Sequence, residues 1–120
     1  LEKSAIANKA FTLLNNKELV LPYVLEVMGY MEADEKYALS PNFLMEMMDL
    51  NEAWMDAEDD SDKQAIIQQV EQIKKAIYAP IQTYMEMDQV DTISQEAMLQ
   101  IKDYYYKKKY LDRILEDFHH

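Results

Sequence analysis

The feature that most constrains the fold is the recurrence of apolar residues at helical spacing in three long segments of the chain. In residues 40–57, at about 100° per residue, one arc of roughly 60° holds Phe43, Met47, Leu50 and Trp54. The second and third segments carry similar stripes, made of Ile66, Val70, Ile73, Ile77, Ile81 and Tyr84 and of Ala97, Ile101, Tyr104, Tyr105, Leu111, Leu115 and Phe118. A single glycine in 120 residues leaves few helix breakers. The pattern therefore predicts an all-α fold in which residues 40–118 form a three-helix antiparallel bundle.

Local signals place the ends of these helices. Ser40 followed by Pro41 combines a hydroxyl cap with a proline at the first helical position, so a helix is predicted from there to about Ala57. Pro80 lies inside the second stripe and predicts a kink near Ala79. The second and third helices are each predicted to open on a capping box, formed by Ser61 with Gln64 and by Thr92 with Gln95.

The N-terminal region contains two shorter helical patterns. Residues 4–16 have apolar residues at helical spacing, and a second helix is predicted over residues 17–28, with Pro22 near its first turn. Gly29, the single glycine, is predicted to end that helix in the left-handed conformation. Residues 31–39 are predicted to be a connector. One side of the second helix carries Leu21, Val24, Leu25 and Met28.

Composition excludes several classes of function. The net charge of −11 disfavours binding to nucleic acid or to anionic membranes, and no apolar run is long enough to span a membrane. Without cysteine there is no disulfide framework and no cysteine-based zinc or iron–sulfur site. Glycine-rich phosphate loops, nucleophile elbows and zinc-protease motifs are all missing from the sequence. No catalytic residue, cofactor or resident metal is therefore predicted.

Two features that could suggest metal sites have simpler interpretations. The acidic run in residues 56–62 lacks the glycine of a calcium-binding EF-hand loop, so a solvated turn between helices is predicted. His119 and His120 are expected to be the remainder of a purification tag. A metalloenzyme of the helical-bundle type is disfavoured because paired Glu-x-x-His motifs are absent from the sequence.

The segment after Ser40 carries more apolar residues than one buried face needs. Leu44, Met48 and Met55 form a second stripe about 110° from the first, and Met45 lies further round, next to Glu52. This stripe either packs on another helix or on the N-terminal segment, or it forms an exposed protein-binding surface. The far face is acidic and carries Glu46, Asp49 and Asp56.

The last helix shows a similar surplus. Tyr110 is predicted opposite its core stripe, with Tyr106 and Ile114 nearby, and three lysines precede it. Tyr110 is either an ordinary surface tyrosine or part of a binding surface. If it lies beside Leu44 and Met48, the two surpluses form one patch.

These segments resemble a known family. "FLMEMMDLNEAW" and "YYYKKKYLDRILEDF", with the long helix between them, are similar to the C-terminal domain of HscB-type J-protein co-chaperones of iron–sulfur cluster assembly. "SAIANKAFTLLNNKELVLPYVLEVMG" is similar to the end of the family's J-domain. The resemblance implies a J-domain remnant in residues 1–30, a connector in residues 31–39 and a scaffold-binding bundle in residues 40–118.

The resemblance also implies a partner and a binding surface. The family's C-terminal domain binds the IscU-type scaffold protein, and its binding positions correspond here to Leu44, Met45, Met48, Asp49, Glu52, Lys109 and Tyr110. Tyr110 stands where the family has Phe, Met48 where it has Leu, Asp49 where it has Glu and Lys109 where it has Arg. The polar positions thus depart from the family's pattern most.

The His-Pro-Asp motif through which J-domains stimulate a DnaK-class chaperone (HscA in this system) is absent from the sequence. Since the chain starts at Leu1, a truncation is expected. The intact protein would deliver its scaffold to the chaperone in the bacterial cytoplasm or the mitochondrial matrix. The alternative from the residues alone is a structural helical protein whose surplus stripe forms a homodimer.

Overall fold

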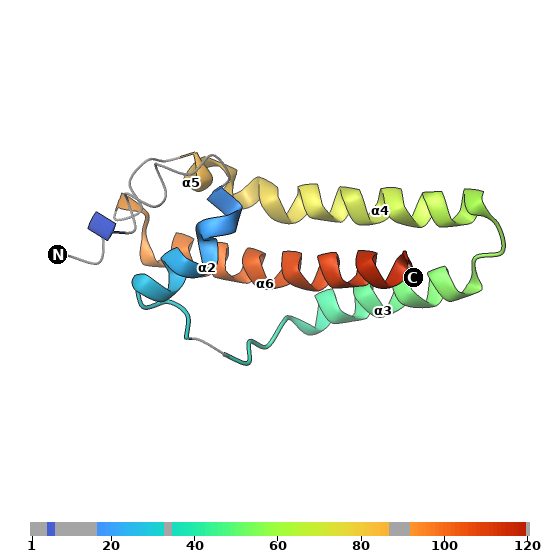
Figure 1. Ribbon diagram of the computed structural model, residues 1–120, viewed down its shortest axis with the longest axis horizontal. Helices are drawn as coiled ribbons and strands as arrows, with labels where there is room; N and C mark the ends of the chain where they lie inside the picture. The colour runs from blue at the N-terminus through green and yellow to red at the C-terminus, as the bar shows by residue number, and fades with distance from the viewer. Residues whose placement is uncertain (1–4, 7–16, 33–34, 87–91, 120) are drawn as a thin grey trace. The chain divides into compact units, whose positions relative to one another are not determined.

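The structure, a computed structural model, describes residues 5–6, 17–32, 35–86 and 92–119. The chain divides into two compact units. Unit 1 comprises Leu1–Lys36 and Pro80–Tyr105, and unit 2 comprises Tyr37–Ala79 and Tyr106–His120. Both units are helical in their described parts (Figure 1), so the predicted all-α class is confirmed. The predicted boundaries between residues 30 and 40 stay predictions.

Helix α3 spans Pro41–Asp56 in unit 2. The Ser40 hydroxyl accepts a hydrogen bond from the backbone N–H of Phe43 at 3.3 Å, and Pro41 occupies the first turn. The helix ends where Ala57 takes an extended conformation, with φ −66° and ψ 128°. The predicted start and end of this helix are therefore confirmed.

Helix α4 spans Asp60–Tyr78 and follows α3 after a short acidic turn. The Asp59 carboxylate accepts a hydrogen bond from the backbone N–H of Asp62 at 2.9 Å, and the Asp62 carboxylate accepts one from the N–H of Glu58 at 3.4 Å. The predicted capping box at Ser61 is therefore wrong. A carboxylate before the helix pairs with an amide and also interacts favourably with the helix dipole, whereas a hydroxyl does only the first.

The core of unit 2 is shared by α3, α4 and the second part of α6, which spans Gln95–Phe118. Each large apolar side chain removed from water contributes about 1.5–3 kcal/mol, so this cluster is the main source of the unit's stability. The predicted three-helix bundle is confirmed (Figure 1). The buried cluster consists of Phe43, Met47 and Leu50 from α3, Ile66 and Val70 from α4, and Leu111, Ile114 and Phe118 from α6.

Two aromatic contacts fix the direction of α3 relative to α6. Phe43 meets Tyr110 edge-on with ring centroids 6.1 Å apart, and Trp54 stacks on Phe118 with centroids 4.2 Å apart. The partners occur in the same order along both helices, so α3 and this part of α6 run parallel. Helix α4 returns from the end of α3 and lies antiparallel to both (Figure 1). This is the up-down-up arrangement of a three-helix bundle.

Helix α6 opens on a serine that lies two positions after the predicted threonine cap. The Ser94 hydroxyl accepts a hydrogen bond from the backbone N–H of Ala97 at 3.2 Å. The predicted capping box on Thr92 and Gln95 is wrong, because Gln95 is already the first helical residue. Ser94 has the three-residue spacing to an unpaired amide that a capping hydroxyl requires.

In unit 1, helix α2 spans Lys17–Val27 and ends as predicted at Gly29, which has φ +83°. The N–H of Tyr30 donates to the carbonyl of Leu25 at 2.8 Å, and the N–H of Gly29 donates to that of Glu26 at 3.1 Å. This pair of hydrogen bonds is the Schellman motif, which needs a left-handed residue at that position. The predicted role of Gly29 is therefore confirmed.

Pro22 lies inside α2 rather than in its first turn, so the predicted position of Pro22 in the helix is wrong. Its missing N–H removes one helical hydrogen bond. Burial of neighbouring side chains offsets that loss, since Leu21, Val24 and Leu25 are each no more than 2% exposed. The helix predicted over residues 4–16 falls, apart from Ala5 and Ile6, outside the described residues.

The helical pattern of α4 is interrupted at Pro80, as predicted. A 3-10 turn, η1, spans Ala79–Ile81, and the short helix α5 follows over Gln82–Met85.

In unit 1, the Lys102 ammonium lies 2.8 Å from a carboxylate oxygen of Glu35. None of the described helices combines the length and the apolar character that a membrane span requires.

Candidate protein-binding surface

The methionines of α3 are divided between a buried face and an exposed face. Met47 is 0% exposed, whereas Met45, Met48 and Met55 are 63%, 67% and 83% exposed. Leu44 is half-buried. The surplus apolar stripe predicted from the sequence therefore faces solvent at its methionines, and only in part at Leu44. The alternative that another helix covers the whole stripe does not hold for unit 2.

The charged residues of α3 are all acidic. Asp49 and Glu52, the two acids predicted to contact a partner, are exposed and lie within about one helical turn of Met48. Exposed apolar groups beside charged residues are typical of protein-binding surfaces. This edge of the surface favours a partner that places basic residues around an apolar contact.

On α6, Tyr110 is half-buried and packs against the core, while Lys109 is exposed. The Tyr110 ring meets Phe43 edge-on, and the Lys107 ammonium lies 5.5 Å from the centre of the same Phe43 ring. Because Phe43 directly precedes Leu44, Tyr110 lies next to the turn of α3 where the predicted partner residues begin. We use the name α3–α6 patch for Leu44, Met45, Met48, Asp49, Glu52, Lys109 and Tyr110.

Ile114 belongs to the core and is 4% exposed, so the prediction that it lies at the surface near Tyr110 is wrong. It stands three residues after Leu111 and four before Phe118, both of which are buried. Residues at these spacings share one face of a helix. Tyr110 precedes Ile114 by one turn and is drawn toward the core for the same reason, which explains why it is half-buried.

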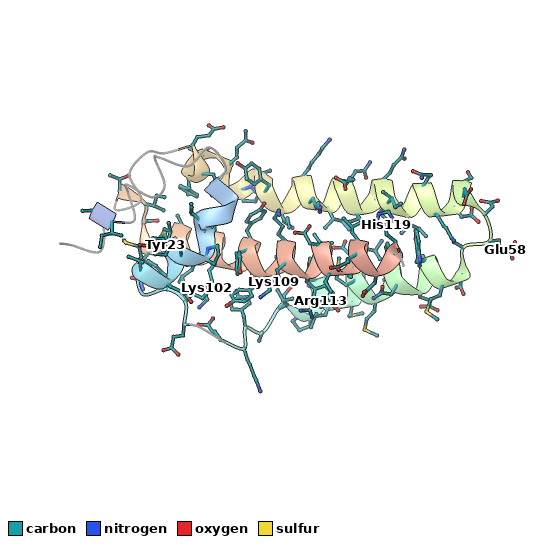
Figure 2. The ribbon with its side chains drawn as sticks, in the orientation of Figure 1. Tyr23, Glu58, Lys102, Lys109, Arg113 and His119 are labelled. Atoms are coloured by element: carbon teal, nitrogen blue, oxygen red, sulfur yellow. The ribbon has the colours of Figure 1, made fainter. Side chains whose placement is uncertain are left out.

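Sequence analysis missed Arg113, an exposed cation on the same helix. Arg113 follows Lys109 by four residues, so both side chains lie on one face of α6 (Figure 2). The contacts of Phe43 with Tyr110 and of Trp54 with Phe118 bracket the segment of α6 that contains Arg113. The four-residue spacing from Lys109 is the signal that could have identified it.

An ion pair between Lys74 and Asp112 ties α6 to α4, and Lys108 of α6 joins it. The carboxylate of Asp112 lies 3.0 Å from the Lys74 ammonium and 3.2 Å from the Lys108 ammonium. Partial burial raises the pKa of Asp112, but hydrogen bonds from Lys74 and Lys108 and their positive charges outweigh that effect and hold the pKa below its usual value. Lys74 and Lys108 therefore have a structural role in unit 2.

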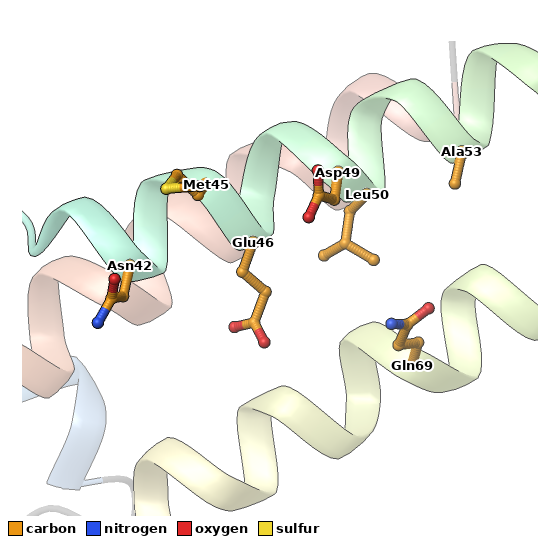
Figure 3. A pocket seen from close by; sticks show the side chains of 7 residues that line it. All are labelled: Asn42, Met45, Glu46, Asp49, Leu50, Ala53 and Gln69. Carbon is orange, nitrogen blue, oxygen red and sulfur yellow. The ribbon is translucent and has the colours of Figure 1, made fainter.

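A groove with a volume of about 510 Å³ runs between α3 and α4 (Figure 3). Glu46 and Leu50 point from α3 toward α4, which contributes Gln69. Two members of the α3–α6 patch, Met45 and Asp49, also line this groove. The exposed apolar surface of α3 is thus continuous from the groove to the patch.

This arrangement defines a protein-binding module. Its exposed apolar groups lie beside carboxylates on α3 and cations on α6. Across the described part of the chain, no group of three or more His, Cys, Asp or Glu residues is arranged to hold a metal ion. The chemistry that the surface offers is apolar contact and charge pairing with another macromolecule.

The profile of the HSCB C-terminal oligomerisation domain family matches residues 39–119, and the chain therefore belongs to this family. The resemblance to an HscB-type C-terminal domain is confirmed, while the J-domain remnant predicted in residues 1–30 lies outside the match. No curated protein and no solved structure matches the chain. Family membership points to an HscB-like co-chaperone role in iron–sulfur cluster assembly, exercised through protein–protein interaction and not through catalysis.

Proposed function

We propose that this domain binds an IscU-type scaffold protein of iron–sulfur cluster assembly through the α3–α6 patch. The observation that carries the proposal is the exposure of Met45 and Met48, at 63% and 67%, on the helix that opens the family's domain. Apolar side chains held in solvent by a well-packed helix are available to a partner without unfolding. Methionine suits this role because its flexible, polarisable side chain adapts to the surface it meets.

The charges around these methionines support a partner of mixed charge. Asp49 and Glu52 on α3 are exposed, as are Lys109 and Arg113 on α6. Groups of opposite charge around a binding surface orient a partner and raise its association rate more than they raise its affinity. The scaffold would dock its own apolar contact on Leu44, Met45, Met48 and Tyr110.

In the intact protein, we propose, the bound scaffold is delivered to a DnaK-class chaperone of the HscA type, whose ATPase a complete J-domain stimulates. Residues 1–30 would be the end of that J-domain, and residues 31–39 would connect it to the scaffold-binding domain. The co-chaperone would work in the bacterial cytoplasm or, in a eukaryote, in the mitochondrial matrix. It would bind no cofactor, no nucleic acid and no membrane.

Calorimetric titration of a purified IscU-type scaffold into the chain tests the proposal. Replacing Leu44, Met48 and Tyr110 together by Ala should abolish measurable binding, because each anchor is worth about 1 kcal/mol or more. Thermal unfolding must accompany this test, since Tyr110 also packs on Phe43 and its loss affects stability. Undiminished binding by a triple variant that still unfolds cooperatively would overturn the patch assignment.

A matched control comes from the same exposed stripe of α3, two helical turns after Met48. The Met45→Ala/Met48→Ala double variant keeps Tyr110 and should weaken binding by about tenfold or more without loss of fold. Met55→Ala removes an even more exposed methionine, 83% exposed, that lies outside the patch. It should bind like the unchanged chain, and equal losses in both variants would show that binding follows general apolarity rather than this surface.

The family description, an oligomerisation domain, favours a second candidate function. Two copies of the chain could cover their exposed α3 methionines by forming a homodimer. Sedimentation at micromolar concentration separates the two candidates. The scaffold-binding proposal expects a monomer without scaffold, whereas the second expects a dimer that Met45→Ala/Met48→Ala dissociates.

A further inference from the structure

The exposed methionines of α3 have a second chemical property besides apolarity. With nine methionines and no cysteine, the chain carries all of its oxidisable sulfur as thioether. We propose that Met45 and Met48 are a reversible oxidation site, at which a peroxide converts the apolar α3–α6 patch into a polar surface. The part of this inference that concerns partner binding rests on the proposed function, whereas the modification itself does not.

Exposure separates the accessible methionines of α3 from the buried one, and of the accessible ones Met45 and Met48 lie in the α3–α6 patch while Met55, 83% exposed, lies outside it. Met45 and Met48 are 63% and 67% exposed, while Met47 between them is 0% exposed and fills the bundle core. Oxidation of thioethers depends on access, so neighbours in the sequence differ greatly in reactivity. The other methionines buried in the described part of the chain are equally shielded: Met31, Met85 and Met98 are each no more than 8% exposed.

Local geometry and charge favour a neutral oxidant. Met45 lines the open groove between α3 and α4, where a small molecule in solution reaches its sulfur. Every charged residue of α3 is acidic, and the chain has a net charge of −11. This field repels anionic oxidants but not hydrogen peroxide, which is uncharged at neutral pH.

The reaction is a two-electron oxygen transfer. A lone pair of the methionine sulfur attacks one oxygen of the peroxide and the O–O bond breaks. The other oxygen takes the proton of the transferred oxygen and leaves as water. Sulfur is thereby oxidised by two electrons and the peroxide is reduced by two. A dithiol reductant reverses the step: the sulfoxide oxygen leaves as water and the two thiols become a disulfide.

The consequence differs between the two faces of α3. A sulfoxide on Met48 or Met45 projects into water and leaves the bundle core intact. It does, however, place a strong dipole where the proposed partner needs an apolar contact, and burying that dipole without a hydrogen bond is unfavourable. Oxidation should therefore weaken binding without unfolding the domain.

The experiment treats the full chain with hydrogen peroxide and locates the added oxygen by peptide mass spectrometry over time. Met45 and Met48 should be oxidised before any measurable oxidation of Met47, with the unfolding temperature nearly unchanged. Retention on a hydrophobic-interaction column should fall, and treatment with dithiol and a methionine sulfoxide reductase should restore it. Equal rates at Met47 and Met48, or an unchanged retention after oxidation, would overturn the proposal.

Two leucine variants assign the effect to the patch. Met45→Leu/Met48→Leu cannot form sulfoxides in the patch, so peroxide should leave its scaffold affinity at its starting value and should lower its retention only through Met55, which is 83% exposed. Met55→Leu keeps both patch methionines and should still lose retention, with about tenfold weaker scaffold binding after oxidation. An equal fall in scaffold affinity in both variants after peroxide treatment would contradict the assignment. If the untreated chain binds no scaffold, the proposed function fails, and the retention measurements still decide whether the patch is oxidised.

Discussion

The two faces of α3 both carry methionine, but one face is buried in the bundle core and the other is exposed to solvent. Met47 and Met48 are adjacent in the chain, yet one is 0% exposed and the other 67% exposed. Met47 lies with Phe43 and Leu50 against α4 and α6, while Met48 lies beside carboxylates in water. Side-chain chemistry therefore does not decide whether a methionine of this helix lies in the core or in solvent. The direction that the helix gives it does.

The largest difference in stability should appear between two variants that each replace one methionine by alanine, one on the buried face and one on the exposed face. Met47→Ala should lower the free energy of unfolding by about 2–5 kcal/mol, because it leaves a cavity in a packed core. Met48→Ala should change it by less than about 0.5 kcal/mol. Urea unfolding of both variants measures the difference, and similar losses in the two would show that the faces are not distinct.

The capping residues extend the comparison to two exposed positions at the start of α4. Asp59→Ala should cost about 1 kcal/mol, since the Asp62 amide then loses its partner at 2.9 Å. Ser61→Ala, at the second residue of α4, should cost only a few tenths of a kcal/mol. Urea unfolding midpoints check this pair, and a larger cost at Ser61 would restore the capping box predicted from the sequence.

The stack of Trp54 on Phe118 lies where the buried face of α3 meets solvent. Trp54 is half-buried, and the Lys63 ammonium lies 5.3 Å from the centre of its ring. A double-mutant cycle with Trp54→Leu and Phe118→Leu should give a coupling of about 0.5–1.5 kcal/mol, as expected for a stacked aromatic pair. A coupling near zero would mean that the α3–α6 register is set elsewhere in the core.

The smallest effect is expected from the ion pairs of Asp112. Because its pKa is lowered in the fold, the carboxylate stabilises unit 2 above the unfolded-state pKa of about 3.9, and this contribution is lost as pH falls through the lower folded-state value. With its side chain 47% exposed, the contribution should not exceed about 0.5–1 kcal/mol at neutral pH.

Urea unfolding of the unchanged chain and of Asp112→Asn at pH 7 and at pH 3 measures this contribution. The difference in stability between the two should be present at pH 7 and should shrink as the pH is lowered toward the folded-state pKa of Asp112, where its carboxylate becomes protonated. Asp117→Asn removes the same charge from the same helix and corrects for the change in net charge. A difference as large at pH 3 as at pH 7 would rule out the ion pairs as its source.

Helical periodicity predicted most of the fold, because burial of one stripe follows directly from the geometry of a helix. The wheel of α3 correctly separated Phe43, Met47 and Leu50 from the exposed methionines. Capping was predicted less well. Ser61 and Thr92 fit the capping motif, but Asp59 and Ser94 lie nearer the true helix starts and hold the hydrogen bonds. Sequence motifs cannot rank neighbouring caps that compete for the same amides.

The surface of α6 was predicted least well. Ile114 was placed at the surface although it is buried, and Tyr110 was expected to face water although it packs on Phe43. These errors arose because the core side of α6 faces two helices at once, which widens its buried arc beyond one stripe. The position of α3 against α6 is a tertiary property that no local pattern in the sequence contains.

The central claim is that a scaffold protein docks on the exposed face of α3 and the adjoining face of α6. Backbone amide chemical shifts of the isotope-labelled chain, recorded while an unlabelled IscU-type scaffold is added, test it most directly. The largest chemical-shift changes should cluster on residues 44–52 and 109–113, with little change along α2. Changes confined to other helices, or none at saturating scaffold, would contradict it.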